Sequence, residues 1–148
     1  MLSLRMYFFV LYSLSPIQKG IQAGHAALEY AKKYQSSNIY TEFINKHKTW
    51  VILDGGTTND SYEYVGSLNK IQKLLTANMV DHAYFREPDL NNSLTAVCFI
   101  ADERVWNFND YPDSPIRLVD EYKNMCDNMG GYKNVFLRYL IKDRKLAS

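Results

Sequence analysis

The sequence predicts a single α/β domain with three layers: a mixed, mostly parallel four-stranded sheet with helices on both faces, plus a C-terminal helical extension. Two observations predict this class. The chain has 148 residues, the size of one domain, and 47% of them are apolar. Short apolar runs rich in aromatic and β-branched residues alternate with segments of helical periodicity. We expect residues 1–106 to form the α/β domain and residues 107–148 to pack on it as the helical extension.

The N-terminal segment predicts a buried strand followed by a long helix. Residues 6–13 are a continuous aromatic and β-branched run, typical of a strand buried on both faces. Ser15 and Pro16 suit a helix start, because Ser caps and Pro lacks an N–H that would be unpaired there. We expect this helix to reach Tyr34, with a short helix near residues 39–44. Its apolar stripe is predicted from residues at helical spacing: Ile17, Ile21, Gly24, Leu28 and Ala31.

The middle of the chain predicts three further strands and one helix. Residues 50–53 form a strand closed by the turn residues 54–56, and residues 82–86 and 94–101 form two more strands. The turn-rich residues 87–93 join the last two. Ser67 is expected to cap the intervening helix, whose inner face is predicted to hold Leu68, Ile71, Leu74, Leu75 and Met79.

The C-terminal third predicts a loop and two helices. Residues 107–115 read as a loop, residues 116–129 as an amphipathic helix, and Gly130 and Gly131 as its stop. The last segment, residues 132–147, carries apolar residues on one side (Val135, Phe136, Tyr139 and Leu140) and ends in the basic Lys142-Asp143-Arg144-Lys145. That basic end is either a solvated final helical turn, which suits the helix dipole, or a tail that contacts phosphate.

Composition excludes several classes of protein. A formal net charge of +1 argues against a nucleic-acid binder that works by bulk electrostatics. The apolar run at residues 6–12 is too short and too aromatic for a membrane span, so we expect no membrane association and a cytoplasmic protein. Cys98 reads as a buried apolar residue, and no cysteine pair or His/Asp/Glu cluster has metal-ligand spacing. We therefore expect no metal and no cofactor.

One row of polar residues along the first helix is the main functional candidate. Gln18, Gln22, His25 and Glu29 are spaced so that they share one face of the helix, beside its apolar stripe. Amides and an imidazole there can hold a ligand by directed hydrogen bonds, and His25 is a natural proton carrier near neutral pH. The alternative is that His25 is a packed helix histidine with a structural partner.

Charged residues at two other places extend this candidate site. Lys19 lies at the helix N-terminus, where it either neutralises a phosphate or is an ordinary exposed lysine. Arg86, Glu87 and Asp89 concentrate charge between two predicted strands. A carboxylate there could orient His25 or activate water, although Pro, Asp and Asn are also ordinary turn formers.

A separate tripeptide, His47-Lys48-Thr49, has the His-x-Thr form that two-histidine phosphoesterases use in pairs. The required second copy is absent, because Ala-Ala follows His25 and Ala-Tyr follows His82. The sequence therefore disfavours that class of enzyme.

The segment Gln22-Ala23-Gly24-His25-Ala26-Ala27-Leu28, following an apolar strand, resembles the first-helix signature of type II peptidyl-tRNA hydrolases. Gln22 and His25 match the Gln and His of that signature, and Thr95 matches a family Thr. Gln18 stands at the position of the family lysine, with Lys19 beside it. The likeness in element order covers roughly residues 6–102. The run of residues 86–92 also resembles that of phage proteins, which suggests a viral source.

The resemblance implies hydrolysis of the ester of peptidyl-tRNA, with tRNA or a related nucleotide as the partner. His25, Glu87 and Asp89 would be catalytic. The substrate would be bound by Gln18, Lys19, Gln22, Arg86 and Thr95. One alternative is a non-catalytic binder of a nucleotide, or a host inhibitor of viral origin, on the same fold. Another is an assembly module whose added helices form a dimer interface, and we expect a homodimer.

Overall fold

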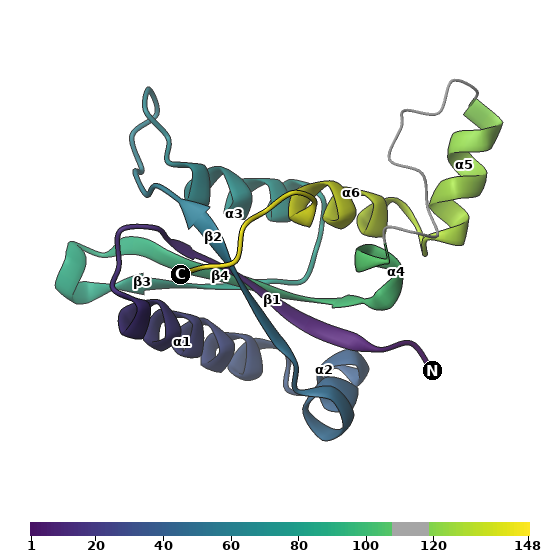
Figure 1. The fold of residues 1–148 in the computed structure, drawn as a ribbon, viewed down its shortest axis with the longest axis horizontal. Coiled ribbons are helices and arrows are strands. Elements are labelled where there is room, and N and C mark those ends of the chain that lie inside the picture. Colours follow the sequence, from purple (N-terminus) through teal and green to yellow (C-terminus); the bar gives the residue numbers. More distant parts are fainter. Residues whose placement is uncertain (108–118) are drawn as a thin grey trace.

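The computed structural model describes residues 1–107 and 119–148 (Figure 1). The elements follow one another as strands and helices of the α/β class. In chain order they are β1 (Leu4–Leu11), α1 (Pro16–Tyr34), α2 (Asn38–Glu42), a π-helical turn (Phe43–His47), β2 (Trp50–Gly56), α3 (Ser67–Ala77), β3 (Ala83–Glu87), a 3-10 turn (Pro88–Leu90), β4 (Ser93–Asp102), α4 (Glu103–Trp106), α5 (Val119–Asn128) and α6 (Tyr132–Ile141).

The sheet has four strands in the order β2-β1-β4-β3 and is mixed, as predicted. Its pairing is not mostly parallel, however. Only β1 and β2 pair in parallel, whereas β1 with β4 and β3 with β4 are antiparallel. Strand β4 follows β3 through a tight turn, and such a connection reverses the chain direction. As a result β1, β2 and β3 all run the same way, and their carboxyl ends lie at one end of the sheet.

Helices cover both faces of the sheet and complete the three layers. Figure 1 shows α1 against one face and α3 with α6 against the other. Alternate residues of β1 point to opposite faces: Phe8 joins the core under α1, and Phe9 joins the core under α3 and α6. Both rings are fully buried, so β1 is the apolar centre that both layers share.

Helix α1 faces the sheet with a different side from the one the sequence pattern predicts. Ile17 and Leu28 are 77% and 68% exposed, whereas Ala23 and Ala26 are fully buried. The small side chains let the helix backbone lie close to β4, where the Cys98 thiol is 3.4 Å from the carbonyl oxygen of Ala26. Cys98 is buried as predicted, and burial raises the pKa of its thiol to about 12. The predicted apolar stripe therefore lies on the outer face of α1.

Helix α3 also departs from its predicted pattern at its ends. Leu74 and Met79 are exposed, and Val80, just after the helix, is buried in their place. Gly66, not Ser67, is the N-cap residue. The Ser67 hydroxyl instead donates to the carbonyl of Gly55 at 3.0 Å and accepts from the Thr57 N–H at 2.9 Å. It thus ties the start of α3 to the end of β2.

The C-terminal segment returns to the sheet after α6. Helix α6 ends at Ile141, so the basic residues 142–145 do not form a final helical turn. Asp54 N–H donates to the Lys145 carbonyl and Ala147 N–H to the Ile52 carbonyl, each at 2.9 Å. These bonds run along the outer edge of β2. Edge strands present unpaired backbone groups, and here the chain's own end covers them.

Asp102, at the end of β4, anchors the C-terminal helices to the sheet. Its carboxylate accepts hydrogen bonds from the Arg104 side chain at 2.9 and 3.0 Å and from Asn134 at 3.2 Å. Burial works to raise the pKa of Asp102, but the bonds from Arg104 and Asn134 outweigh it and leave that pKa below its usual value. Helix α6 then adds Leu137, Leu140 and Ile141 to the core of the α3 face.

Two elements predicted for the C-terminal third lie partly outside the residues that the structure describes. The predicted loop at residues 107–115 and the start of the predicted helix at residues 116–129 lie outside the described residues, except for Asn107. From Val119 the helix is present, and Gly130 and Gly131 follow it with φ of 95° and 108°. Within the described ranges, no helix is both long and apolar enough to cross a membrane.

A glycine pair tests the packing of β2 on β1. A Cβ added at Gly55 would lie 2.9 Å from the Val10 carbonyl oxygen and 2.8 Å from Leu68 Cδ1, whereas one at Gly20 in α1 meets nothing within 4 Å. We expect Gly55→Ala to lower the free energy of unfolding by about 1–3 kcal/mol through overpacking. Gly20→Ala should raise it by about 0.5–1 kcal/mol, because alanine is the better helix former. Urea unfolding of both variants measures this, and a Gly55→Ala protein as stable as wild type would contradict the packing.

Candidate functional site

The start of the polar row of α1, with Gln18 and Gln22, lies near the end of the sheet at which β1, β2 and β3 finish. Helix α1 contacts β3, β4 and β1. In α/β proteins, ligands bind outside the carboxyl ends of the strands, where helix N-termini and loops gather. Ser15 caps the start of α1, its hydroxyl accepting from the Gln18 N–H at 3.2 Å. The helix therefore begins at this end, close to the β3–β4 turn.

Gln22, Thr95 and Glu87 form one hydrogen-bonded network there. The Thr95 hydroxyl donates to Gln22 Oε1 at 2.6 Å, and Gln22 Nε2 donates to Glu87 Oε2 at 3.3 Å. Gln22 is 2% exposed and Thr95 is fully buried. Glu87 is half-buried, so its carboxylate lies between the network and solvent. Both the carbonyl and the amino group of the Gln22 amide are therefore hydrogen-bonded, and the amino group gives the Glu87 carboxylate a partner on α1.

His25 follows Gln22 along the same face of α1 and is half-buried. Its ring stacks on Phe85, with centroids 4.4 Å apart and planes 18° apart. Among the described residues no side chain or backbone group is hydrogen-bonded to the imidazole. Phe85 and Glu87 alternate on β3 and so point to the same face. The His25 imidazole on α1 and the Glu87 carboxylate on β3 therefore lie on the sides of these two elements that face each other.

Lys19 lies away from this network. Its ammonium donates to the carbonyl oxygen of Ser148 at 3.0 Å, on the side of α1 that faces β2. A recess of about 120 Å³ lies there, lined by Pro16, Lys19, Gly20, Ile52, Ala147 and Ser148. The structure thus brings Lys19 to the C-terminal segment and not to Glu87.

Arg86 points to the opposite face of β3 from Glu87. Its guanidinium donates to the two carboxylate oxygens of Asp60 at 2.9 and 3.0 Å and to the Asn92 carbonyl at 3.1 Å. The hydrogen bonds from Arg86 hold the pKa of Asp60 below its usual value. Asp60 belongs to the loop between β2 and α3, so this pair ties that loop to the β3–β4 turn. The Arg86 guanidinium is thereby occupied by a side chain of the same protein.

The two remaining candidates are exposed. Gln18 lies in the first turn of α1 and Asp89 in the 3-10 turn after β3. Neither side chain has a hydrogen-bond partner within the part of the chain that is described. Among the side chains that the structure describes, no group of three or more His, Cys, Asp or Glu residues could hold a metal ion.

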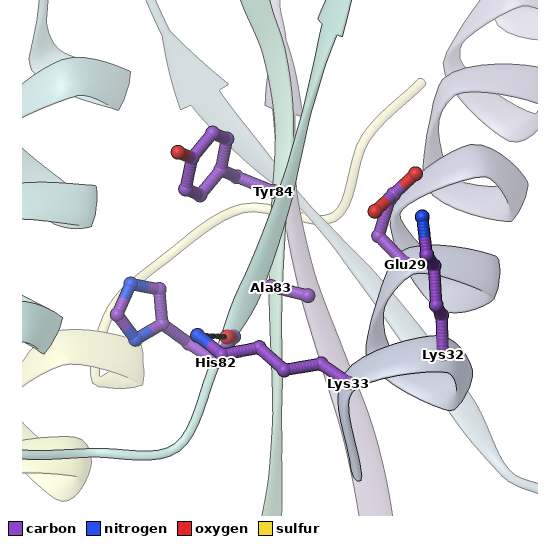
Figure 2. Close-up of a pocket in the computed structure, with 6 residues that line it drawn as sticks. All are labelled: Glu29, Lys32, Lys33, His82, Ala83 and Tyr84. Carbon is purple, nitrogen blue, oxygen red and sulfur yellow. Dashed lines mark hydrogen bonds between the residues drawn. The ribbon is translucent and has the colours of Figure 1, made fainter. Parts of the chain in front are cut away.

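A surface pocket of about 440 Å³ lies farther along α1, next to the start of β3 (Figure 2). Glu29, from the same polar row, lines it together with Lys32, Lys33, His82, Ala83 and Tyr84. Figure 2 shows the Lys33 side chain reaching the backbone carbonyl of His82, a contact of 3.5 Å. His82 is itself buried, with its Nδ1 2.7 Å from the Val80 carbonyl.

Sequence reasoning missed two contributors to this region. Phe85, the ring beneath His25, could have been found from the alternation along residues 83–87, which places it on the face of Glu87. Lys33 gave no signal, because its role depends on how close the end of α1 comes to β3. Comparison with known proteins adds no assignment, since no protein-family model and no curated protein matches the chain.

The buried link from Thr95 to Gln22 can be tested by a matched pair of substitutions. Thr95→Val keeps the shape but removes the hydroxyl, leaving the buried Gln22 oxygen without a donor. We expect it to lower the free energy of unfolding by about 1–3 kcal/mol. Thr95→Ser keeps the hydroxyl and should cost less. Chemical denaturation compares the two, and equal stability of the Val variant and wild type would show that the bond contributes nothing.

Proposed function

We propose that this protein hydrolyses the ester bond of peptidyl-tRNA or of a closely related acyl-RNA. The observations that carry the proposal are the half-buried Glu87 carboxylate, hydrogen-bonded to Gln22 at 3.3 Å, and the His25 imidazole, stacked on Phe85 two residues before Glu87 on β3. Ester hydrolysis needs a base that activates water and an acid that protonates the leaving oxygen. A half-buried carboxylate and an imidazole with no hydrogen-bond partner among the described residues are suitable groups for these two tasks.

The reaction follows from these two groups. Glu87 takes a proton from a water molecule, whose oxygen forms a bond to the ester carbonyl carbon. The tetrahedral intermediate collapses, the bond between that carbon and the ribose oxygen breaks, and His25 in its protonated form donates a proton to the leaving oxygen. The products are a peptide carboxylate and a free ribose hydroxyl, and proton exchange with solvent restores both side chains.

Gln22 and Thr95 act in this scheme as positioning residues and not as direct substrate ligands. Both groups of the Gln22 amide are already hydrogen-bonded, and Thr95 has no exposed surface. Gln18 and Asp89 are exposed and are the available polar contacts for substrate. Lys19 and Arg86, bound to Ser148 and Asp60, take no part.

A turnover assay on peptidyl-tRNA tests the proposal. Glu87→Gln keeps the shape of the side chain and its place next to Gln22 but removes the base, so we expect kcat to fall by about 100-fold or more. His25→Gln should also lower kcat. Glu63→Gln is the matched control, because Glu63 is exposed in the loop between β2 and α3 and should retain activity. Wild-type protein with no turnover, or a Glu87→Gln variant with full turnover, would refute the assignment.

A second candidate function is supported by the geometry of His25. Its ring lies flat on Phe85, so its opposite face could stack on a nucleobase, as in non-catalytic nucleotide binding. Under this alternative the protein binds a nucleotide without turning it over. Thermal-shift measurements with nucleoside monophosphates should then show a rise in Tm that His25→Ala abolishes, because ligand binding stabilises the native state by mass action. A rise that persists in His25→Ala would locate the nucleotide elsewhere.

A further inference from the structure

A second polar pocket lies at the other end of the sheet, where β1 and β2 begin and β4 ends. Its volume is about 330 Å³, within the range of roughly 300–1,000 Å³ typical of small-molecule sites. Side chains from the start of β1, from the π-helical turn and from α4 meet there. The lining includes Ser3, Arg5, Lys46, His47, Thr49 and Trp106.

Two cationic side chains, Arg5 and Lys46, and one carboxylate line this pocket. Arg5 lies over the ring of Trp106, with its guanidinium carbon 4.3 Å from the ring centroid, so its orientation is fixed by an aromatic face. Neither Arg5 nor Lys46 forms an ion pair with a carboxylate among the residues that the structure describes. Glu103 is the acidic lining residue, and its Oε1 already accepts the Ser3 N–H at 2.8 Å.

The His-x-Thr tripeptide noted in the sequence forms one wall. Lys48 has a left-handed backbone, with φ of 61°, directly after the π-helical turn. His47 and Thr49 line the pocket, while Lys48 does not. Single turns of π-helix often occur at functional sites, and this one ends at His47, with Thr49 two residues later lining the same cavity.

His47 has an unmet hydrogen bond. Its Nε2 is buried and has no hydrogen-bond partner among the residues that the structure describes, and a carboxylate oxygen of Glu42 is 3.7 Å away. A buried polar atom without a partner costs free energy. Glu42 is too far away for a hydrogen bond, so an acceptor oxygen in the pocket within reach of His47 would relieve this cost.

We propose that this pocket binds the phosphate group of a small phosphomonoester. Such a dianion offers several acceptor oxygens in different directions. Arg5, Lys46, His47 and the Thr49 hydroxyl supply donors from separate elements, and charge-assisted hydrogen bonds of this kind are the strong ones. The site is independent of the proposed hydrolase, because it lies at the opposite end of the sheet from Glu87.

NMR titration of the wild-type protein tests the site without a substitution. The probes are inorganic phosphate, adenosine monophosphate and adenosine, and the reporters are the His47 ring and the Trp106 indole. We expect both phosphate-bearing probes to shift these signals in a saturable way and adenosine to leave them unchanged. Equal shifts with adenosine, or no shift at these reporters with either phosphate-bearing probe, would overturn the proposal.

Two substitutions and one control refine the test on the full chain. Lys46→Gln and Thr49→Val should each weaken binding of adenosine monophosphate by about tenfold, which corresponds to about 1.4 kcal/mol. Lys48→Gln removes the same charge from the same segment but lies outside the pocket lining, and should change Kd less than twofold. A Lys48→Gln loss as large as that of Lys46→Gln would reduce the effect to bulk charge and refute the site. Peptidyl-tRNA turnover should be unchanged in Lys46→Gln, so failure here leaves the hydrolase proposal to its own test.

Discussion

The rotation of α1 about its own axis is the constraint on which the rest of the Glu87 site depends. Ala23 and Ala26 let the helix backbone lie against β4, and the bond from Thr95 to Gln22 fixes the helix beside them. Breaking the hydrogen bond of this buried amide would cost free energy. The same rotation puts His25 over Phe85 and turns Ile17 and Leu28 outward. The close packing of two alanines and one interior hydrogen bond thus together set which face of the helix meets the sheet.

The fold class could be predicted because apolar runs and helical periodicity are local signals. The helix from Pro16 to Tyr34 was expected within a residue, and all four strands were expected near their places. Strand pairing was less predictable, since a chain pattern does not say which strands become neighbours. The face of α1 was predicted wrongly for a physical reason: size and apolarity favoured Ile17 and Leu28, whereas close packing selected Ala23, Ala26 and a hydrogen-bonded Gln22.

Candidate residues were identifiable by type, but their partners were not. The sequence indicated Gln22, His25, Glu87 and Thr95 through spacing and resemblance, and the fold brings three of them into one hydrogen-bonded network. It also indicated Arg86, and nothing local could reveal that Asp60 fills its guanidinium fork. Likewise, His47 and Thr49 line a pocket only because α4 and the start of β1 pack beside them in the fold. Tertiary neighbours decide whether a charged side chain is free for a ligand.

The central place of β1 has a consequence for how the chain acquires its structure. Leu4 of β1 pairs with Asp102 of β4, so the antiparallel edge of β1 stays unpaired until β4 has formed. Contacts between such distant segments require closure of a long loop, which slows folding. On the ribosome, Phe8 and Phe9 are made well before Cys98 and Val97, the residues of β4 with which they pair. While the intervening segment is made, β1 lacks its antiparallel partner, and in this interval a chaperone would have most effect.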